Sequence, residues 1–427
     1  MTKKIAFVAY YQKKNIYSFN ALIGAIETEE TLKDISIYFI RGKEKLNNDL
    51  KIILQNHEQV ILGISFFTTQ IWEISQLIKI LRKRYGNKLL YLAGGPHPTG
   101  DPEETLRMGF DLVVIGEGEE TLIELLKNIK FEHNILDIKG IAFLTDNDKY
   151  HFTGRRPILN LDKYPPLPIK NVRFGAIEIT RGCPFICYFC QTPYILGTQP
   201  RHRSIDSICD TVKFMKRYEK TDIRFITPNA FSYGSRDGKT LNISKLEELL
   251  IRIKEIISPE GRIFLGSFPS EVRPEHVNTQ TLDLVLKYAA NNNIVIGAQS
   301  GSQRVLDLCH RGHTIEDVYK AVELTINANL YAYVDFIFGL PDENEKDMDL
   351  TLRVMRDLTN MGGRIHTHSF IPLPQTAFAN KEAKEINTKI RMFIQKLNSK
   401  GDSFGDWKKQ EKVAIKITNY LKSKKFE

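Results

Sequence analysis

The stretch AIEITRGCPFICYFC, residues 176–190, decides how the rest of the chain is interpreted. It begins as a short apolar strand and runs directly into a loop with three cysteines, Cys183, Cys187 and Cys190, spaced C-x3-C-x2-C. The chain has five cysteines in all, too few for a disulfide scaffold of this length, so three in one loop indicate a metal centre. The alternative is three thiols packed as small hydrophobes, which leaves their clustering to coincidence.

Thiolates are soft ligands that favour zinc, copper(I) or iron-sulfur clusters. A structural zinc site takes four protein ligands, so zinc would need a recruited fourth ligand such as His202 or His310. A [4Fe-4S] cluster held by three cysteines instead leaves one iron open to a substrate or cofactor. The spacing therefore favours a cluster with an open iron, and zinc is the second choice.

Downstream of this loop, strand and helix patterns alternate along the chain. Six such units predict a parallel barrel or part of one, whose functional loops lie at the carboxyl ends of the strands. We expect this barrel over residues 173–376 and a lysine-rich helical extension over 377–427. The predicted strands are AIEIT, IRFIT, RIFLGS, IVIGA, YVDFIF and IHTHSF, and the predicted helices lie near 204–219, 243–257, 279–290, 314–328 and 346–360.

Upstream of the loop, short and wholly apolar strands indicate a parallel sheet that is buried on both faces. We predict an α/β, Rossmann-like doubly wound domain over residues 1–135, followed by a hairpin and proline-rich linker over 136–172. Ligands of such sheets bind beyond the carboxyl ends of the strands. The strands are IAFVAY, ISIYFI, VILGIS, LLYLAG and DLVVIG, with helices near 18–28 and 71–81.

Composition is that of a folded protein with more than one domain. The 427 residues are 42% hydrophobic and 26% charged, which excludes a disordered or collagen-like chain. The start, MTKKIAFVAYY, lacks the apolar core of a signal peptide, and no apolar run approaches the roughly 20 residues of a membrane span. We therefore expect a cytoplasmic protein. The net charge of +9 is spread along the chain, so we do not expect nucleic-acid binding.

The cysteine loop resembles that of the radical S-adenosylmethionine (SAM) superfamily, in which an aromatic residue, here Phe189, precedes the last cysteine. The resemblance implies a [4Fe-4S] cluster on the three cysteines, with SAM chelated to the open iron and cleaved by one electron to a 5'-deoxyadenosyl radical. ITPNAF at 226–231 stands at the family's Gly-Gly-Glu turn without those residues, whereas SFPSEVRP, IGAQSGS and VDFIFGLP resemble later cofactor-binding strand ends. The implied SAM-binding residues are Tyr188, Phe189, Thr227, Asn229, Ser270, Arg273, Gln299, Ser302 and Phe338.

Three loops of the first domain resemble the cobalamin-binding domain that is fused to many radical SAM enzymes. They are SFFTTQ at 65–70, AGGPHP at 93–98 and GEGEET at 116–121. The Asp-x-His-x-x-Gly motif that supplies a lower axial histidine is absent, which is common in the methyltransferase branch. The implied cobalamin-binding residues are Tyr10, Tyr11, Ser65, Thr68, Thr69, Gly94, Gly95, Pro96, His97, Gly116, Glu117, Gly118 and Glu119.

Together these resemblances imply a cobalamin-dependent radical SAM methyltransferase that uses a [4Fe-4S] cluster, SAM and methylcobalamin. Catalysis is then carried by the cofactors, with no catalytic side chain assigned and with a low-potential electron donor as partner. The chain is similar throughout to an archaeal subfamily near the glutamine C-methyltransferase of methyl-coenzyme M reductase, which implies a protein or peptide substrate methylated at a glutamine α-carbon, with that enzyme's alpha subunit as the expected partner. The expected substrate contacts are Tyr233, Asp335, His366 and His368.

Two other functions stay open at this point. One is a cobalamin-dependent radical SAM enzyme that rearranges or cyclises a small molecule without methylating it. The other is a non-catalytic metal or corrinoid binder, or a zinc-stabilised nucleic-acid adaptor, which the positive net charge would favour.

Overall fold

The computed structural model describes residues 4–423, which form two compact units divided between Gly175 and Ala176. Within the described residues, no helix combines the length and the apolar character that crossing a membrane requires.

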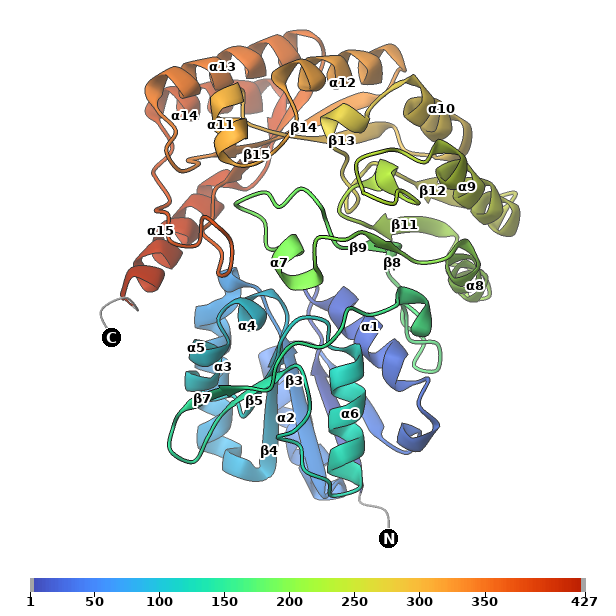
Figure 1. Cartoon of the computed structure of the whole chain (residues 1–427), viewed down its shortest axis with the longest axis vertical. Coiled ribbons are helices and arrows are strands. Elements are labelled where there is room, and N and C mark those ends of the chain that lie inside the picture. The colour runs from blue at the N-terminus through green and yellow to red at the C-terminus, as the bar shows by residue number, and fades with distance from the viewer. Residues whose placement is uncertain (1–3, 424–427) are drawn as a thin grey trace. The chain divides into compact units, whose positions relative to one another are not determined.

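The first unit is built on one seven-stranded sheet with the order β2-β1-β3-β4-β5-β6-β7, and β1 to β5 are parallel (Figure 1). Its strands are β1 (Ile5–Tyr10), β2 (Ser36–Ile40), β3 (Gln59–Ser65), β4 (Leu89–Gly94), β5 (Leu112–Val114), β6 (Ile141–Leu144) and β7 (Tyr150–Phe152). Its helices are α1 (Ile16–Ile26), α2 (Lys43–Asn56), α3 (Ile71–Tyr85), α4 (Pro96–Gly100), α5 (Pro102–Arg107) and α6 (Glu119–Lys130).

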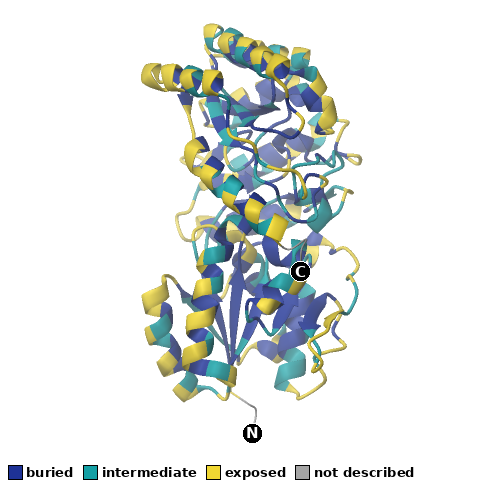
Figure 2. Cartoon of the chain, turned by 90° about the vertical axis from the view of Figure 1, so that its left-hand side faces the viewer, coloured by how far each residue is buried: buried dark blue, intermediate teal, exposed yellow. Residues whose placement is uncertain are grey.

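Burial follows from the apolar pattern of this sheet. Strand β1 is buried at every position, because helices cover both of its faces. The first core packs α1 and α6 on the sheet through residues such as Phe7, Ile23 and Leu122, and Figure 2 shows exposed residues on the outward helix faces. The strand order reverses direction between β1 and β3, which is where doubly wound sheets open a ligand crevice.

The boundary of the first unit differs from the sequence prediction. The hairpin of β6 and β7 pairs antiparallel with β5 and so extends the sheet, instead of forming part of a linker. The proline-rich segment is also fixed to this unit, because the Glu27 carboxylate accepts hydrogen bonds from the backbone N–H groups of Ile169, Lys170 and Asn171. The unit therefore continues to Gly175 and does not end near residue 135.

The second unit contains six parallel strands in chain order, as expected for a partial barrel. Strands β8, β11 and β12 form one sheet and β13 to β16 a second, and a parallel bridge pairs Val272, in the segment after β12, with Ile296 of β13. Its strands are β8 (Ile177–Glu178), β9 (Thr180–Arg181), β10 (Arg201–His202), β11 (Asp222–Ile226), β12 (Arg262–Phe264), β13 (Asn293–Gln299), β14 (Tyr331–Phe338), β15 (Arg364–Ser369) and β16 (Ser403–Phe404).

Helices cover the outer side of this barrel, as Figure 1 shows for α8, α9, α10, α12 and α13. They are amphipathic, and most begin at an Asn, Ser or Thr cap that ends the preceding loop at a fixed residue. The helices are α7 (Thr192–Leu196), α8 (Ile205–Lys216), α9 (Ile243–Ile257), α10 (Thr279–Tyr288), α11 (Gln303–Leu308), α12 (Ile315–Asn327), α13 (Glu345–Asn360), α14 (Thr388–Lys400) and α15 (Trp407–Ser423).

Buried and half-buried residues alternate along β14 and β15, so each strand has a fully buried face and a half-buried face. Val334, Phe336 and Ile365 are fully buried, whereas the residues between them are half-buried and line the inner face of the barrel. The chain after Phe378 was predicted as a helical extension, but β16 pairs in parallel with β15, so this region contributes a seventh strand to the barrel.

Candidate functional site: the cysteine loop and the barrel interior

The cysteine loop begins at a glycine that no other residue can replace. Gly182 has φ of +84°, and a Cβ there would lie 2.2 Å from the carbonyl oxygen of Gln199. Strand β10 returns antiparallel to β9, and the backbone N–H of Cys183 donates to the Gly197 carbonyl at 3.1 Å. The loop therefore starts and ends at one place, next to the end of the first barrel strand.

The middle of the loop is anchored by Tyr188. Its N–H donates to the Cys309 carbonyl and its own carbonyl accepts from the N–H of Phe378, both at 3.0 Å. Its ring stacks on His310 with centroids 5.3 Å apart and meets Phe378 edge-on. Phe189 packs partly buried against the same apolar cluster, so both aromatic residues hold the loop on the barrel.

Two of the three thiols, those of Cys183 and Cys190, are held in a setting that disfavours the free thiolate. Burial, and then the neighbouring Cys190 and Cys187, raises the pKa of Cys183 to about 11, despite a hydrogen bond from the Phe185 backbone. Burial also raises the pKa of Cys190. A bound metal centre offsets this cost, because it binds the deprotonated sulfur.

Spacing separates a cluster from a single zinc ion. Among the described residues, only Asp335, His366 and His368 place three ligand atoms all within 4.8 Å of one another, so at least one pair of the three cysteine sulfurs lies farther apart than that. Thiolates on one zinc lie about 3.8 Å apart, given Zn–S bonds of about 2.3 Å, whereas a cluster binds each thiolate through a different iron. His202 does not complete a zinc site either, because its Nδ1 contacts Thr180 Oγ1 and its Nε2 contacts the Ser235 carbonyl.

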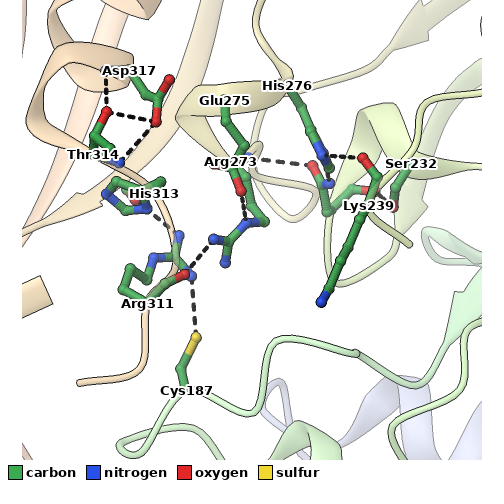
Figure 3. A network of polar contacts seen from close by, with 12 residues as sticks. Cys187, Ser232, Lys239, Arg273, Glu275, His276, Arg311, His313, Thr314 and Asp317 are labelled. Atoms are coloured by element: carbon green, nitrogen blue, oxygen red, sulfur yellow. Dashed lines mark hydrogen bonds and ion pairs between the residues drawn. The ribbon is translucent and has the colours of Figure 1, made fainter. Parts of the chain in front are cut away.

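A buried polar network leads from Cys187 into the barrel (Figure 3). Arg311 lies between Cys187 and Arg273: its Nη1 is 3.5 Å from Cys187 Sγ, its Nη2 donates to the Gly297 carbonyl at 2.9 Å, and its own carbonyl accepts from Arg273. Arg273 also pairs with Glu275 and stacks 3.4 Å over the ring of Phe185. Two positive charges therefore lie beside the cysteine loop.

Local hydrogen bonds position the side chains of this network. Thr314 caps α12 in a capping box with Asp317, so the helix starts directly after Arg311 and His313. On the other side, Asn229 accepts from the backbone N–H of Arg273 at 3.3 Å and contacts His276 Nδ1 at 2.5 Å, while His276 Nε2 contacts the Lys239 carbonyl.

Several buried atoms of this network have no hydrogen-bond partner. They are Arg273 Nη1, Glu275 Oε2, Arg311 Nε and His313 Nδ1. Ser267 Oγ, six residues before Arg273 in the sequence, is also buried without a partner. Burial lowers the pKa of His313 to about 2, with the positive charges of Arg311 and Arg273 adding to the shift, so its Nδ1 is an acceptor. Unpaired donors and acceptors of both kinds fit a zwitterionic ligand, such as the amino and carboxylate groups of SAM.

The other residues implied as SAM contacts divide into two groups. Gln299 ends β13 at a register shift with φ of +73°, and its Nε2 lies beside Arg311, since both would contact a Cβ on Gly297. Thr227 is buried next to Asn229. By contrast, Ser270 closes a turn onto the Ser267 carbonyl, Ser302 caps α11 and donates to Asp347, and Phe338 is 2% exposed in the core. The side chains of these last three residues are engaged within the second unit.

Comparison with protein families agrees with this geometry. The radical SAM superfamily matches residues 177–355, which include the cysteine loop and the Arg273 network, and the B12 binding domain matches residues 41–126. The chain joins a B12-binding domain to a radical SAM domain. The fold and the pairing of these two domains are thus those expected from the sequence, whereas the expected relation to the glutamine C-methyltransferase is not confirmed.

Relatives of known sequence are distant. An uncharacterized methyltransferase of Pyrococcus horikoshii is 27% identical over 339 residues, which cover 76% of this chain and 70% of the relative. An uncharacterized protein of Methanocaldococcus jannaschii is 27% identical over 384 residues, or 80% of this chain and 73% of the relative.

Solved structures share the fold. The radical SAM methyltransferase TsrM from Kitasatospora setae, with cobalamin and a [4Fe-4S] cluster bound, superposes with a TM-score of 0.68 at 15% identity, covering 89% of this chain and 78% of TsrM. The cobalamin-dependent SAM radical enzyme OxsB has a TM-score of 0.64 at 19% identity, covering 83% of this chain and 52% of OxsB.

In the B12-binding domain, the predicted cobalamin loops all follow strand ends on the carboxyl edge of the sheet. Ser65, Gly94 and Gly116 end or follow β3, β4 and β5. Gly95 has φ of +94°, and a Cβ there would lie 2.5 Å from Ser65 Oγ, so this loop packs tightly on its neighbour. A Cβ on Gly94 would meet only Val114, at 3.9 Å, which leaves this backbone open to a ligand.

Other predicted cobalamin residues are engaged within the domain. Tyr10 is 3% exposed and Tyr11 donates to Asn20 Oδ1 at 2.9 Å. His97, on α4 beside Pro96, is fully buried, with its Nδ1 3.2 Å from Thr68 Oγ1. Thr69 lies in the single turn before α3, and Glu117, Gly118 and Glu119 lead into α6, where Glu117 accepts from the Leu159 N–H at 2.9 Å.

The expected substrate contacts do not all come together. Asp335, His366 and His368 lie on the inner face of β14 and β15, where the register pairs Asp335 with His366. Burial opposes ionisation of Asp335, but hydrogen bonds from both histidines outweigh it and lower its pKa. Burial, with the Asp335 charge adding, raises the pKa of Glu271, which faces the same group. Tyr233 is 1% exposed, and its hydroxyl donates to the Arg203 carbonyl, so it is a packing residue.

Sequence reasoning missed Arg311, Glu275 and His313. The dense run CHRGH at 309–313 was the available signal, since two histidines and an arginine there directly precede the N-terminal cap of α12. In the first domain it missed Asn15, whose Nδ2 donates to the carbonyls of Tyr10 and Ser65 and so ties together the ends of β1 and β3.

Proposed function

We propose that the protein is a cobalamin-dependent radical SAM methyltransferase that transfers a methyl group to an unactivated carbon. The observation that carries the proposal is the set of three thiols in one loop beside a buried network with unpaired donors and acceptors. When bound, SAM at a [4Fe-4S] cluster supplies a 5'-deoxyadenosyl radical, and cobalamin supplies the methyl group.

The chain's own residues bind and orient these groups. Cys183, Cys187 and Cys190 hold the cluster, and the unpaired Arg273 Nη1 and Glu275 Oε2 are placed to pair with the carboxylate and the ammonium of SAM. Both are held by the rest of the network, so binding requires little reorganisation. The loops at Ser65, Gly94 and Gly116 would hold cobalamin in the B12-binding domain, and the sequence contains no Asp-x-His-x-x-Gly motif.

For the substrate, we propose a glutamine α-carbon in a peptide, with the alpha subunit of methyl-coenzyme M reductase as the first candidate. Support comes from the similarity to the archaeal subfamily noted above. The inner face of the barrel also offers Asp335, His366 and Glu271, which suit an amide-bearing substrate better than an apolar one. The partners are then the substrate protein and a low-potential electron donor.

The test is methylation of a synthetic peptide from that subunit. The anaerobically purified chain, loaded with cobalamin and reduced, is incubated with the peptide and SAM that carries a trideuterated methyl group. We expect a mass increase of about 17 on the glutamine, together with 5'-deoxyadenosine and S-adenosylhomocysteine. Both small products without a labelled peptide would refute the substrate and leave the reaction type intact.

A non-methylating reaction is the second candidate. An anaerobic magnesium-protoporphyrin IX monomethyl ester cyclase of Cereibacter sphaeroides is 25% identical over 323 residues, covering 70% of this chain and 49% of that enzyme. A reaction of that kind consumes SAM and forms 5'-deoxyadenosine without S-adenosylhomocysteine. Quantifying the two products in one assay therefore separates the candidates.

A further inference from the structure

The inner face of β14 and β15 carries a group of three side chains that the cluster does not use. Asp335 Oδ1 and His366 Nδ1 lie 2.7 Å apart, His366 Nδ1 and His368 Nε2 lie 3.2 Å apart, and His368 Nε2 and Asp335 Oδ1 lie 3.7 Å apart. The same three atoms define all three distances. They form a compact triangle of one carboxylate oxygen and two imidazole nitrogens.

This triangle has the size of a metal site. Its three corners lie on a circle of about 1.9 Å radius, so a point about 2.0–2.1 Å from every corner lies just above their plane. That distance is the usual bond length from zinc to imidazole nitrogen and to carboxylate oxygen. The three atoms would thus bind one ion without a change of backbone.

The backbone fixes this geometry. His366 and His368 are two residues apart on one strand, so they share a face, and Asp335 is the register partner of His366 on the neighbouring strand. Phe404 stacks on the His366 ring with centroids 4.5 Å apart and restricts its rotation. The site therefore belongs to regular sheet structure, which positions ligands more accurately than a loop does.

Hydrogen bonds from the two histidines stabilise the Asp335 carboxylate, but they bring three polar atoms close together. Both nitrogens approach the same carboxylate oxygen, and they lie 3.2 Å from each other, where one proton at most can stand between them. The Asp335 side chain is only 13% exposed, so its negative charge needs a counter-charge. A divalent cation accepts a lone pair from all three atoms and supplies that charge.

We propose that Asp335, His366 and His368 bind a divalent transition-metal ion, of the zinc or iron(II) class, inside the barrel. Two histidines and one carboxylate leave further coordination positions open. An oxygen or nitrogen donor of the substrate occupies one of them, so the ion anchors the substrate on the inner face of the barrel. This last role rests on the proposed function, whereas the ion site itself does not.

A neighbouring glutamine provides a sharp test. Gln410 Nε2 lies 3.4 Å from His368 Nδ1, and its Oε1 accepts from the Ser369 N–H at 2.8 Å. A histidine that binds metal through Nε2 carries its proton on Nδ1 and is strengthened by an acceptor there. Gln410→Glu supplies that acceptor and should tighten binding of the ion about tenfold.

The experiment is zinc binding by the full chain with its iron-sulfur cluster reconstituted, so that the cysteines are occupied. Zinc per chain is measured by mass spectrometry of the metal after chelator treatment, and affinity by competition with a chelating dye. Asp335→Asn, His366→Gln and His368→Gln are compared with His133→Ala, an exposed histidine of the first unit. Absorbance of the cluster and circular dichroism confirm that each variant is folded.

We expect one zinc per chain in the unmodified protein and in His133→Ala, at least about 100-fold weaker binding in the three ligand variants, and tighter binding in Gln410→Glu. Equal affinity in the folded ligand variants, or no zinc bound at all, would overturn the proposal and show that the group is a hydrogen-bonded triad. Methyl transfer is not measured here, so a failed ion site and a failed methyltransferase assignment give different results.

Discussion

Replacing Arg311 by methionine should lower the reduction potential of the cluster by about 100 mV. Arg311 Nη1 lies 3.5 Å from Cys187 Sγ, so its positive charge stabilises the electron that the cluster gains on reduction. At an effective dielectric constant of about 20, two unit charges 3.5 Å apart interact by about 4.7 kcal/mol. The electron is spread over the whole cluster, and doubling the distance halves this to about 2.4 kcal/mol, or about 100 mV for one electron.

The assay is a redox titration of the full chain without SAM, followed by electron paramagnetic resonance of the reduced cluster. Arg311→Lys keeps the charge and should stay near the unmodified potential, and Arg353→Met, on the exposed side of α13, should leave it unchanged. A shift smaller than about 20 mV in Arg311→Met with the cluster intact, or a shift to higher potential, would refute the placement of the cluster beside this arginine.

Three further predictions test other parts of the molecule. Cys187→Ala should abolish the iron-sulfur absorbance near 400 nm, whereas Cys209→Ala, on the buried face of α8, should retain it; absorbance that survives in the first variant would show a different ligand set. Burial raises the pKa of Glu343 from 4.5 to about 7 in the folded chain. The unfolded chain therefore ionises this carboxyl at a lower pH than the folded chain does. As the pH rises from 4.5 to about 7, the free energy of unfolding falls by about 3 kcal/mol. Glu343→Gln should therefore raise the free energy of unfolding by about 3 kcal/mol at pH 8 and hardly at pH 4; urea unfolding at both pH values checks this, and equal effects would contradict it. Gly95→Ala places a Cβ 2.5 Å from Ser65 Oγ at a φ of +94°, which should cost about 2 kcal/mol and reduce cobalt retained after loading with cobalamin; a thermal midpoint and cobalt content equal to those of the unmodified protein would show that the loop tolerates a side chain.

Local patterns predicted most of the fold, because the strands are continuous apolar runs and the helices are amphipathic. The spacing of Cys183, Cys187 and Cys190 predicts a metal centre in the same way, since these candidate ligands lie within one loop. The order of the six barrel strands also followed from the alternation of patterns along the chain. These features depend on short stretches of sequence, which can be recognised without knowing what they contact.

Long-range pairing could not be predicted. Strand β16 is two residues long, and it pairs with β15 only because α14 brings the chain back. The sequence of β6 and β7 has the pattern of a hairpin, but nothing in it indicates that β6 pairs with β5. Whether a hairpin stands alone or extends a sheet depends on the partner edge, which lies elsewhere in the sequence.

Single polar residues were the hardest to interpret. Ser302 stands in a stretch similar to a SAM-binding segment, yet its hydroxyl caps α11 and donates to Asp347. No role was predicted for Arg311 from the sequence, yet its Nη1 lies 3.5 Å from Cys187 Sγ. A serine or arginine has the same local pattern in both roles, and only the distance to a partner remote in sequence separates them.

We propose that one chain holds a [4Fe-4S] cluster on three cysteines together with cobalamin. The most direct measurement is iron, sulfide, zinc and cobalt analysis of protein purified anaerobically and loaded with cobalamin, followed by SAM turnover under reduction. We expect four irons, four sulfides and one cobalt per chain, with both 5'-deoxyadenosine and S-adenosylhomocysteine formed. Zinc in place of iron at the cysteine loop, with no turnover of SAM, would contradict it.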